Sequence, residues 1–125
     1  MSIERVTSLT DEEWALIDNI EPCPHEIAES DIFLVKRIDA LIVGYLKRDY
    51  LGHVHAVFIN RDFRGQKIGP ALLSDCEGAS KIEGVTELSA GVRNNNSAAI
   101  KLFTKNGFSC KDTGNDYVMF TKRLS

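Results

Sequence analysis

The stretch from His53 to Leu73 reads HVHAVFINRDFRGQKIGPALL, and the rest of the chain is interpreted from it. An apolar, β-branched run comes first, a basic turn containing Gly65 follows, and a second apolar run begins near Gly69. This order predicts a strand, a loop and the start of a helix. The first turn of a helix carries unpaired N–H groups and the positive end of the helix dipole. The stretch therefore predicts a site for an anion, above all a phosphate.

The loop from Arg64 to Gly69, RGQKIG, differs from the two commonest phosphate-binding fingerprints. Its glycines lack the spacing of GxGxxG, and no Gly-Lys-Ser/Thr follows as in a nucleotide P-loop. An ordinary turn between a strand and a helix also explains these residues, because glycine is common in turns. On this stretch alone both interpretations stay open.

A second stretch, from Asn94 to Phe108, reads NNNSAAIKLFTKNGF. Asn96 is suited to cap a short helix, and Gly107 can adopt the left-handed conformation that ends one. The apolar residues between them recur at helical spacing: Ala99, Leu102 and Phe103. One strand-like segment, Val85 to Gly91, separates this helix from the first stretch.

Together the two stretches resemble the motifs of the GCN5-related N-acetyltransferase (GNAT) superfamily. In that family an Arg/Gln-x-x-Gly-x-Gly/Ala loop binds the coenzyme A pyrophosphate, and an Asn-x-Ala-Ala-x-x-Leu-Tyr-x-x-x-Gly-Phe helix flanks the pantetheine arm. The resemblance is best from about Leu41 to Leu124. It implies an α/β (α+β) fold: a mixed, mostly antiparallel sheet with a central, splayed pair of parallel strands, flanked by helices. Residues 1–125 are expected to form one domain of this kind.

The hydrophobic pattern predicts a compatible order of elements. A first helix is expected from a capping box at Thr10 to about Ile20, and the sequence from Glu21 to Pro24 stops it. Two further helices are expected, one from 68 to about 82 and one after Asn96. At most one helical turn is expected at 25–30. Strands are expected at 3–7, 32–38, 40–47, 53–59, 85–91, 108–111 and 116–122. The helix between 59 and 85 implies that the strands before and after it are parallel.

The resemblance also implies which residues contact coenzyme A. The main chain of Val57 and Ile59 would pair with the pantetheine amides as another strand would. Main-chain N–H groups of one loop would hold the pyrophosphate. This loop comprises Arg64, Gly65, Gln66, Lys67, Ile68 and Gly69. Lys67 stands where the family's motif has its first glycine, so it adds charge near the phosphates or distorts the loop.

Three residues of the second stretch have roles implied in the same way. Asn96 matches a polar residue that touches the pantetheine arm, and a plain helix cap is the alternative. Lys105 can reach a coenzyme phosphate, or it lies on a solvated face. Phe103 packs against the arm, but the family usually has a tyrosine there that protonates the departing thiolate. Water or another hydroxyl, such as Tyr117 or Ser97, then takes this role, or the reaction is slow or absent.

The candidate base is one of two histidines, His53 and His55. Because side chains of a strand alternate, both are expected on the same face as Val57 and Ile59. Several relatives carry a carboxylate at this place, and a neutral imidazole can also accept a proton near neutral pH. Two ordinary histidines on a half-buried strand are the alternative, since the sequence shows no orienting partner. A metal is not expected, because no Cys or carboxylate nearby completes a ligand set.

Composition limits the location and the partners of the protein. Fifteen basic and eighteen acidic side chains give a net charge of −3, and no Lys/Arg cluster is present, so nucleic acid is not expected as a partner. The three cysteines are widely spaced, which argues against disulfides and zinc and for buried free thiols. The longest apolar run, Ala40 to Leu46, is too short for a membrane span. With no signal-peptide pattern at the start, a cytoplasmic protein is expected.

The sequence therefore predicts an acetyl-CoA-dependent N-acetyltransferase that transfers the acetyl group by direct attack of an amine in a ternary complex. The acceptor is a small-molecule or protein amine, and a homodimer is an open possibility. The alternative from another class is a non-catalytic acyl-CoA-binding or regulatory module of the same fold. Phe103 and Lys67 keep that alternative open.

Overall fold

The computed structural model describes residues 2–21 and 25–124. The predicted helix stop at Pro22 and Pro24 and the thiol of Cys23 lie outside the described residues. The helices are α1 (Asp11–Ile20), α2 (Ile68–Ile82) and α3 (Ser97–Lys105), with a 3₁₀ turn, η1, at Arg61–Phe63. The strands are β1 (Glu4–Arg5), β2 (Ile32–Ile38), β3 (Leu41–Arg48), β4 (His53–Ile59), β5 (Glu87–Arg93), β6 (Ser109–Asp112) and β7 (Tyr117–Arg123).

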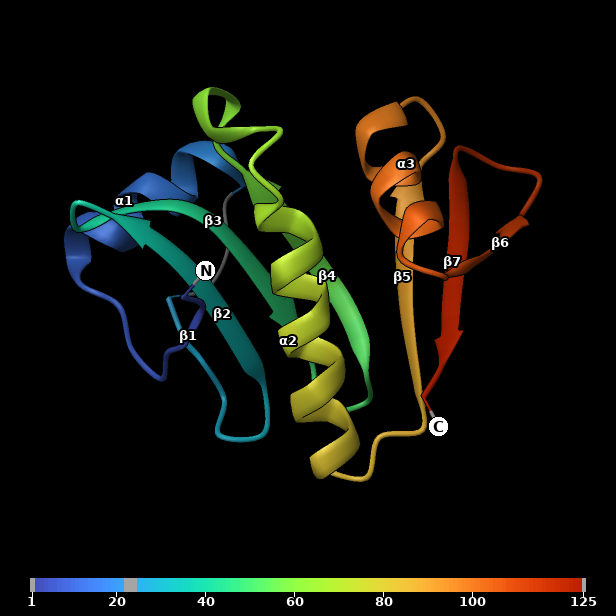
Figure 1. Ribbon diagram of the computed structural model, residues 1–125, viewed down its shortest axis with the longest axis horizontal. Coiled ribbons are helices and arrows are strands. Elements are labelled where there is room, and N and C mark those ends of the chain that lie inside the picture. Colours follow the sequence, from blue (N-terminus) through green and yellow to red (C-terminus); the bar gives the residue numbers. More distant parts are fainter. Residues whose placement is uncertain (1, 22–24, 125) are drawn as a thin grey trace.

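All seven strands belong to one sheet, with the order β1-β2-β3-β4-β5-β7-β6 (Figure 1). Every neighbouring pair is antiparallel except β4 and β5, which α2 connects as a crossover. The mixed, mostly antiparallel sheet with one parallel pair, predicted from the sequence, is confirmed. The pair is short: it is formed by His53 with Ser89 and by Val54 with Ala90, and beyond these residues the strands separate.

Gly52 sets the point at which the two halves of the sheet meet. Its carbonyl oxygen accepts the N–H of Ser89 at 3.0 Å, just before the parallel pairing begins. A Cβ atom on Gly52 would lie 2.6 Å from the carbonyl oxygen of Glu87, and its φ of +92° is also one that glycine adopts readily. Glycine therefore allows the β3–β4 hairpin to approach β5 at the base of the split.

Helices cover both faces of the sheet (Figure 1). α2 and α3 pack on one face, where the buried core includes Leu72, Leu73, Phe103 and Phe120. α1 covers the other face with Trp14 and Ile17, against Phe33 and Tyr45. The predicted capping box at the start of α1 is present, since Thr10 and Glu13 exchange side-chain and main-chain hydrogen bonds of 3.1 Å. We call these two sides of the sheet the α2 face and the α1 face.

Some local expectations differ from the structure. β5 begins at Glu87 rather than Val85, because the N–H of Val85 donates to the carbonyl of Ser80 and closes the end of α2. Residues 25–30 form no helical turn, which is consistent with the expectation of at most one. Cys76 is buried as expected, and burial raises the pKa of its thiol to about 11, but Cys110 is exposed because it lies on the edge strand β6. None of the described helices is long and apolar enough to cross a membrane.

Candidate active site

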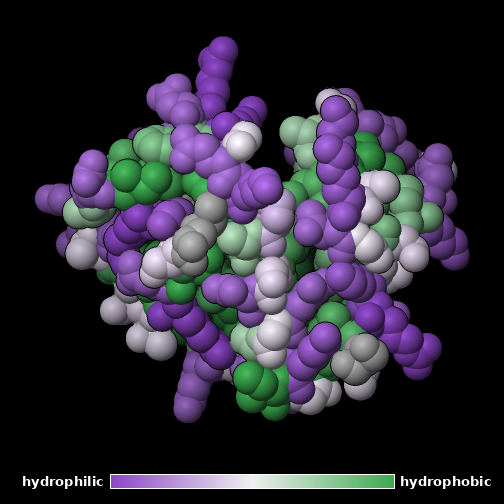
Figure 2. Space-filling model, in the orientation of Figure 1, coloured by the Kyte–Doolittle hydropathy of each residue, from purple (hydrophilic) through white to green (hydrophobic). Residues whose placement is uncertain are grey.

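A cleft of about 810 Å³ opens where β4 and β5 separate. Figure 2 shows the surface hollowed at this place, between the two halves of the molecule. Of the residues predicted to bind coenzyme A or to act as the base, those that line the cleft are His55, Val57, Ile59, Arg64, Gly65, Lys67, Ile68, Gly69, Asn96 and Phe103. His53, Gln66 and Lys105 are not among its lining residues; Lys105 lies at the last turn of α3, whose first turn faces the cleft.

The inner wall of the cleft is an open strand edge. The N–H of Asn60 donates to the carbonyl of Val43 on β3 at 2.7 Å, so the main-chain groups of Phe58 also point towards β3. The alternation then directs those of Val57 and Ile59 towards the gap. In agreement, the Arg64 guanidinium donates to the Ile59 carbonyl at 3.4 Å. An extended amide chain fits such an edge as an additional strand.

The outer end of the cleft is the loop that leads into α2. Lys67 has a φ of 64°, which is the left-handed conformation that glycine adopts most easily. The backbone at this position therefore has a conformation typical of glycine, although the residue is a lysine. No side chain caps α2, so the N–H groups of Ile68 and Gly69 at the start of the helix make no hydrogen bond to a capping side chain. With Lys67 and Arg64 nearby, this end of the cleft suits an anion.

The two loop glycines have different surroundings. Gly65 has a φ of +82°, and a Cβ atom there would meet nothing within 4 Å. A Cβ atom on Gly69 would lie 3.0 Å from a methyl group of Leu102, so Gly69 allows α2 and α3 to pack closely beside the cleft. A bulky residue at Gly69 would therefore disturb folding as well as any ligand, whereas Gly65 is open to solvent.

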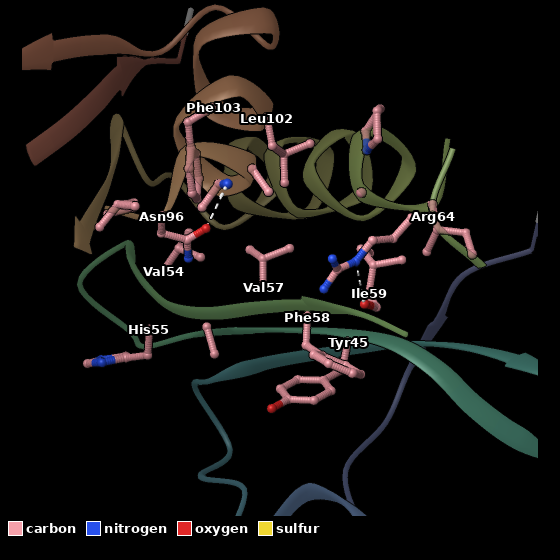
Figure 3. Close-up of a pocket in the computed structure, with 18 of the residues that line it drawn as sticks. Tyr45, Val54, His55, Val57, Phe58, Ile59, Arg64, Asn96, Leu102 and Phe103 are labelled. Atoms are coloured by element: carbon pink, nitrogen blue, oxygen red, sulfur yellow. Dashed lines mark hydrogen bonds between the residues drawn. The ribbon is translucent and has the colours of Figure 1, made fainter. Parts of the chain in front are cut away.

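Asn96 both caps a helix and lines the cleft. Its side-chain oxygen accepts the N–H of Ala99 at 3.1 Å, which accounts for the start of α3. Figure 3 shows its side chain between α3 and β4, near Val54 and Val57. The two roles considered for Asn96 are thus compatible, since capping uses the oxygen atom and leaves the amide nitrogen.

A β-bulge in β4 overturns the expected placement of the histidines. Lys47 pairs with Ala56, but the next residue, Arg48, pairs with Val54, so β4 has one residue more than β3 at His55. Val54 and Val57 consequently both pack on the α2 face. The expectation that His53 and His55 share a face with Val57 and Ile59 is wrong, because the extra residue breaks the period of two.

Both histidines have polar partners that the sequence did not reveal. His55 Nε2 lies 2.8 Å from Asp49 Oδ2, and His53 Nδ1 lies 2.8 Å from the Ser89 hydroxyl. The two imidazole rings meet edge to face at 4.9 Å. Burial lowers the pKa of His53, the neighbouring His55 lowers it further, and Asp49 opposes the shift only in part. His53 is therefore a neutral imidazole at pH 7.

Asp49 organises the turn that precedes β4. Its Oδ1 atom accepts the N–H of Leu51 at 2.9 Å and of His53 at 3.0 Å, while Oδ2 binds His55. Burial raises the pKa of Asp49, but these three donors outweigh burial and bring the pKa below its usual value. The single carboxylate of Asp49 thus holds the turn before β4 and also orients the His55 ring.

Phe103 brings an aromatic ring but no proton donor to the cleft. It is buried, stacked on Phe120 at 5.4 Å and in edge contact with Phe108 at 5.0 Å between ring centroids. Of the two alternative hydroxyls considered, Tyr117 lines the cleft and Ser97 does not. Tyr45 and Glu21 also line it, and no sequence pattern pointed to them, since they meet only through the packing of α1 on β3. In residues 2–21 and 25–124, no three His, Cys, Asp or Glu side chains group as metal ligands.

Comparison with known proteins identifies the family. The model of the Acetyltransferase (GNAT) family matches residues 3–108, and the chain belongs to this family. It is 31% identical over 99 residues to an acetyltransferase of Yersinia enterocolitica, covering 77% of this chain and 67% of the relative. It is 27% identical over 95 residues to a spermidine N(1)-acetyltransferase of Thermoplasma acidophilum, covering 73% of this chain and 59% of that protein.

Solved structures share the fold. The PaiA N-acetyltransferase of Thermoplasma acidophilum, solved in complex with coenzyme A, superposes with a TM-score of 0.78 at 19% identity, over 98% of this chain and 99% of that chain. A protein from Pyrococcus horikoshii superposes with a TM-score of 0.81 at 20% identity, over 99% and 98% of the two chains. The cleft between β4 and β5 thus belongs to a GNAT fold.

The lowered pKa of Asp49 has a consequence for stability. Because the folded-state pKa lies below the unfolded value of about 3.9, the contribution of Asp49 is fully present above that value and is lost as the pH falls through the folded pKa. Asp49→Asn should therefore be less stable than the wild type at pH 7, and the difference should shrink below about pH 4. Urea unfolding across this range measures it.

The control is Asp75→Asn, which alters an exposed carboxyl on α2. Its stability relative to the wild type should not change in this way with pH. A deficit in Asp49→Asn that stays constant down to about pH 2 would contradict the assigned role of the carboxylate.

Proposed function

We propose that this protein is an acetyl-CoA-dependent N-acetyltransferase that transfers the acetyl group to an amine by direct attack in a ternary complex. One observation carries the proposal: an open strand edge leads from a basic loop at a helix start to an imidazole held by a carboxylate. The family membership supports the same activity. Each part of this path has a role in the chemistry.

In the proposed complex, coenzyme A lies on the α2 face of the cleft. The pyrophosphate contacts the N–H groups of the loop from Arg64 to Gly69, with the charges of Arg64 and Lys67 nearby. The pantetheine amides pair with the open edge at Val57 and Ile59. Asn96 and Phe103 form the opposite wall, and the acetyl group then lies near the point where β4 and β5 meet.

His55 is the proposed base. It lines the cleft, and Asp49 fixes its ring through Nε2, so Nδ1 is the atom left to accept a proton. Once the acceptor ammonium has lost its proton, its nitrogen attacks the acetyl carbonyl carbon. A C–N bond forms, the C–S bond breaks, the coenzyme A thiolate leaves, and the nitrogen releases its second proton to water to give the neutral amide. Orientation of the base by a carboxylate follows the same logic as in other Asp–His pairs.

The thiolate takes a proton from water in this proposal, because Phe103 has none to give. Tyr117 is the hydroxyl in the cleft that can substitute for water. The absence of a phenol at position 103 is also the observation that favours a second function, an acyl-CoA-binding or regulatory module without turnover. The enzymatic function predicts that at least one amine causes release of free coenzyme A thiol from acetyl-CoA, and the non-catalytic function predicts that none does.

Coenzyme A binding at the loop is tested with two matched glycine variants. Gly65→Leu and Gly114→Leu each put a side chain at a positive φ in open space, so both carry a similar folding cost of about 1–3 kcal/mol. Coenzyme A should raise the Tm of the wild type and of Gly114→Leu, and Gly65→Leu should lose most of this rise. A full rise in Gly65→Leu would place the pyrophosphate elsewhere.

The role of His55 is tested with His55→Gln. Removing the base should lower kcat/KM by about 10²–10⁴-fold and abolish the decline of the rate at acidic pH, while coenzyme A binding is unchanged. His25→Gln is the matched control, because His25 also pairs with a carboxylate, Asp18, but does not line the cleft. If both variants keep the wild-type pH profile, another group or water is the base.

The missing phenol is tested with Phe103→Tyr. If departure of the thiolate limits turnover, a hydroxyl at this position should raise kcat with every amine, by up to the ~10²–10⁴-fold of a positioned acid. Phe108→Tyr changes the same aromatic cluster outside the cleft and should give no gain. Unchanged turnover would show that loss of the thiolate is not limiting. No turnover in either form, over a broad panel of amines, would favour the non-catalytic function.

A further inference from the structure

The α1 face of the cleft carries opposite charges on its two walls. Figure 3 shows Tyr45 and Phe58 on the side of β4 opposite to Val57, and these two aromatic residues line the cleft from the α1 face. Coenzyme A, as proposed above, occupies the α2 face. In that arrangement the α1 face is the side of the cleft left for the acceptor.

Glu21 supplies the negative charge on one wall. It follows the last turn of α1 and lines the cleft beside Ile20. The Tyr45 hydroxyl donates to Glu21 Oε1 at 3.0 Å, and Tyr45 is only 1% exposed, so its phenol is a fixed anchor. One oxygen of the carboxylate is thereby oriented by the protein, and the other is available to a ligand.

Arg93 supplies the positive charge on the other wall. Ala90 and Val92 pack into the core of the α2 face, so the alternation along β5 turns Arg93 to the α1 face. It pairs with Tyr117 on β7, and its guanidinium lies 5.2 Å from the centre of the Tyr117 ring. Within residues 2–21 and 25–124, Arg93 forms no ion pair with a carboxylate.

We propose that the acceptor is a zwitterionic amine, an amino acid or a short peptide, whose carboxylate binds Arg93 and whose positive charge faces Glu21. This rests on the proposed function. A planar guanidinium that has no carboxylate partner in the described part of the chain is well suited to bind the carboxylate of a ligand in a bidentate manner. One dipolar ligand satisfies both walls, whereas a diamine would satisfy Glu21 and be repelled by Arg93.

The test compares pairs of amines that differ only in the carboxylate. Purified protein is supplied with acetyl-CoA and either lysine or cadaverine, and either phenylalanine or phenethylamine, while free thiol is measured. The amino acid of each pair should have the higher kcat/KM, by about ten- to a hundredfold, which is what one hydrogen-bonded charge contributes. Arg93→Met should abolish this preference, and Arg93→Lys should restore part of it.

Matched variants control for unspecific effects of charge. Arg123→Met removes an exposed arginine from the far end of β7 and should keep the preference. Glu21→Gln should raise the KM of the amino acids, whereas Glu12→Gln, on an exposed part of α1, should not. Equal rates within each pair, or a preference for the diamine or for a lysine inside a peptide chain, would overturn the inference and leave the proposed acetyltransferase intact.

Binding distinguishes this inference from the proposed function if no amine is acetylated. Calorimetry of the protein loaded with coenzyme A should then still detect lysine, with binding lost in Arg93→Met and kept in Arg123→Met. That result would support the zwitterion site while the enzymatic function fails. Absence of lysine binding to the loaded wild type would overturn the inference itself.

Discussion

The short pairing of β4 with β5 is the constraint on which the rest of the structure depends. Two residue pairs join the halves of the sheet, and beyond them each strand has a free edge. Peptide groups at such an edge need a hydrogen-bonding partner, which water or an extended amide ligand can supply. Gly52 fixes where the pairing begins, and the crossover through α2 places a helix start at the open end. The cleft is therefore a consequence of how the sheet is joined.

The sheet separates two kinds of chemistry at this cleft. On the α2 face are main-chain N–H groups and apolar side chains, which suit a phosphate and an amide arm. On the α1 face are Glu21, Arg93 and aromatic side chains, which suit a small charged molecule. The bulge at His55 lies between them, and the hydrogen bonds of Asp49 hold it there. A base at the bulge would be within reach of a reaction between a ligand on the α2 face and a ligand on the α1 face.

Much of this could be predicted from local sequence, because the signals are local. Thr10 and Glu13 mark the start of α1, Asn96 marks the start of α3, and the β-branched run at 53–59 is a strand in the structure. The loop with Lys67 was recognisable by its resemblance to a family motif. Lys67 adopts the left-handed backbone conformation that glycine adopts most easily, which no rule of composition would show.

The sequence by itself determined the order of elements, the parallel pair and the position of the loop that leads into α2, since each follows from periodicity, capping residues or chain connectivity. Tertiary structure alone decided the rest. A single extra residue in β4, visible only in its register with β3, moved the histidines off the face of Val57. Tyr45 meets Glu21 and Arg93 meets Tyr117 because folding brings separate segments together, and Asp49 meets His55 across the turn before β4 because of the bulge. Such contacts depend on register and packing, and neither is encoded in the spacing of residues along one segment.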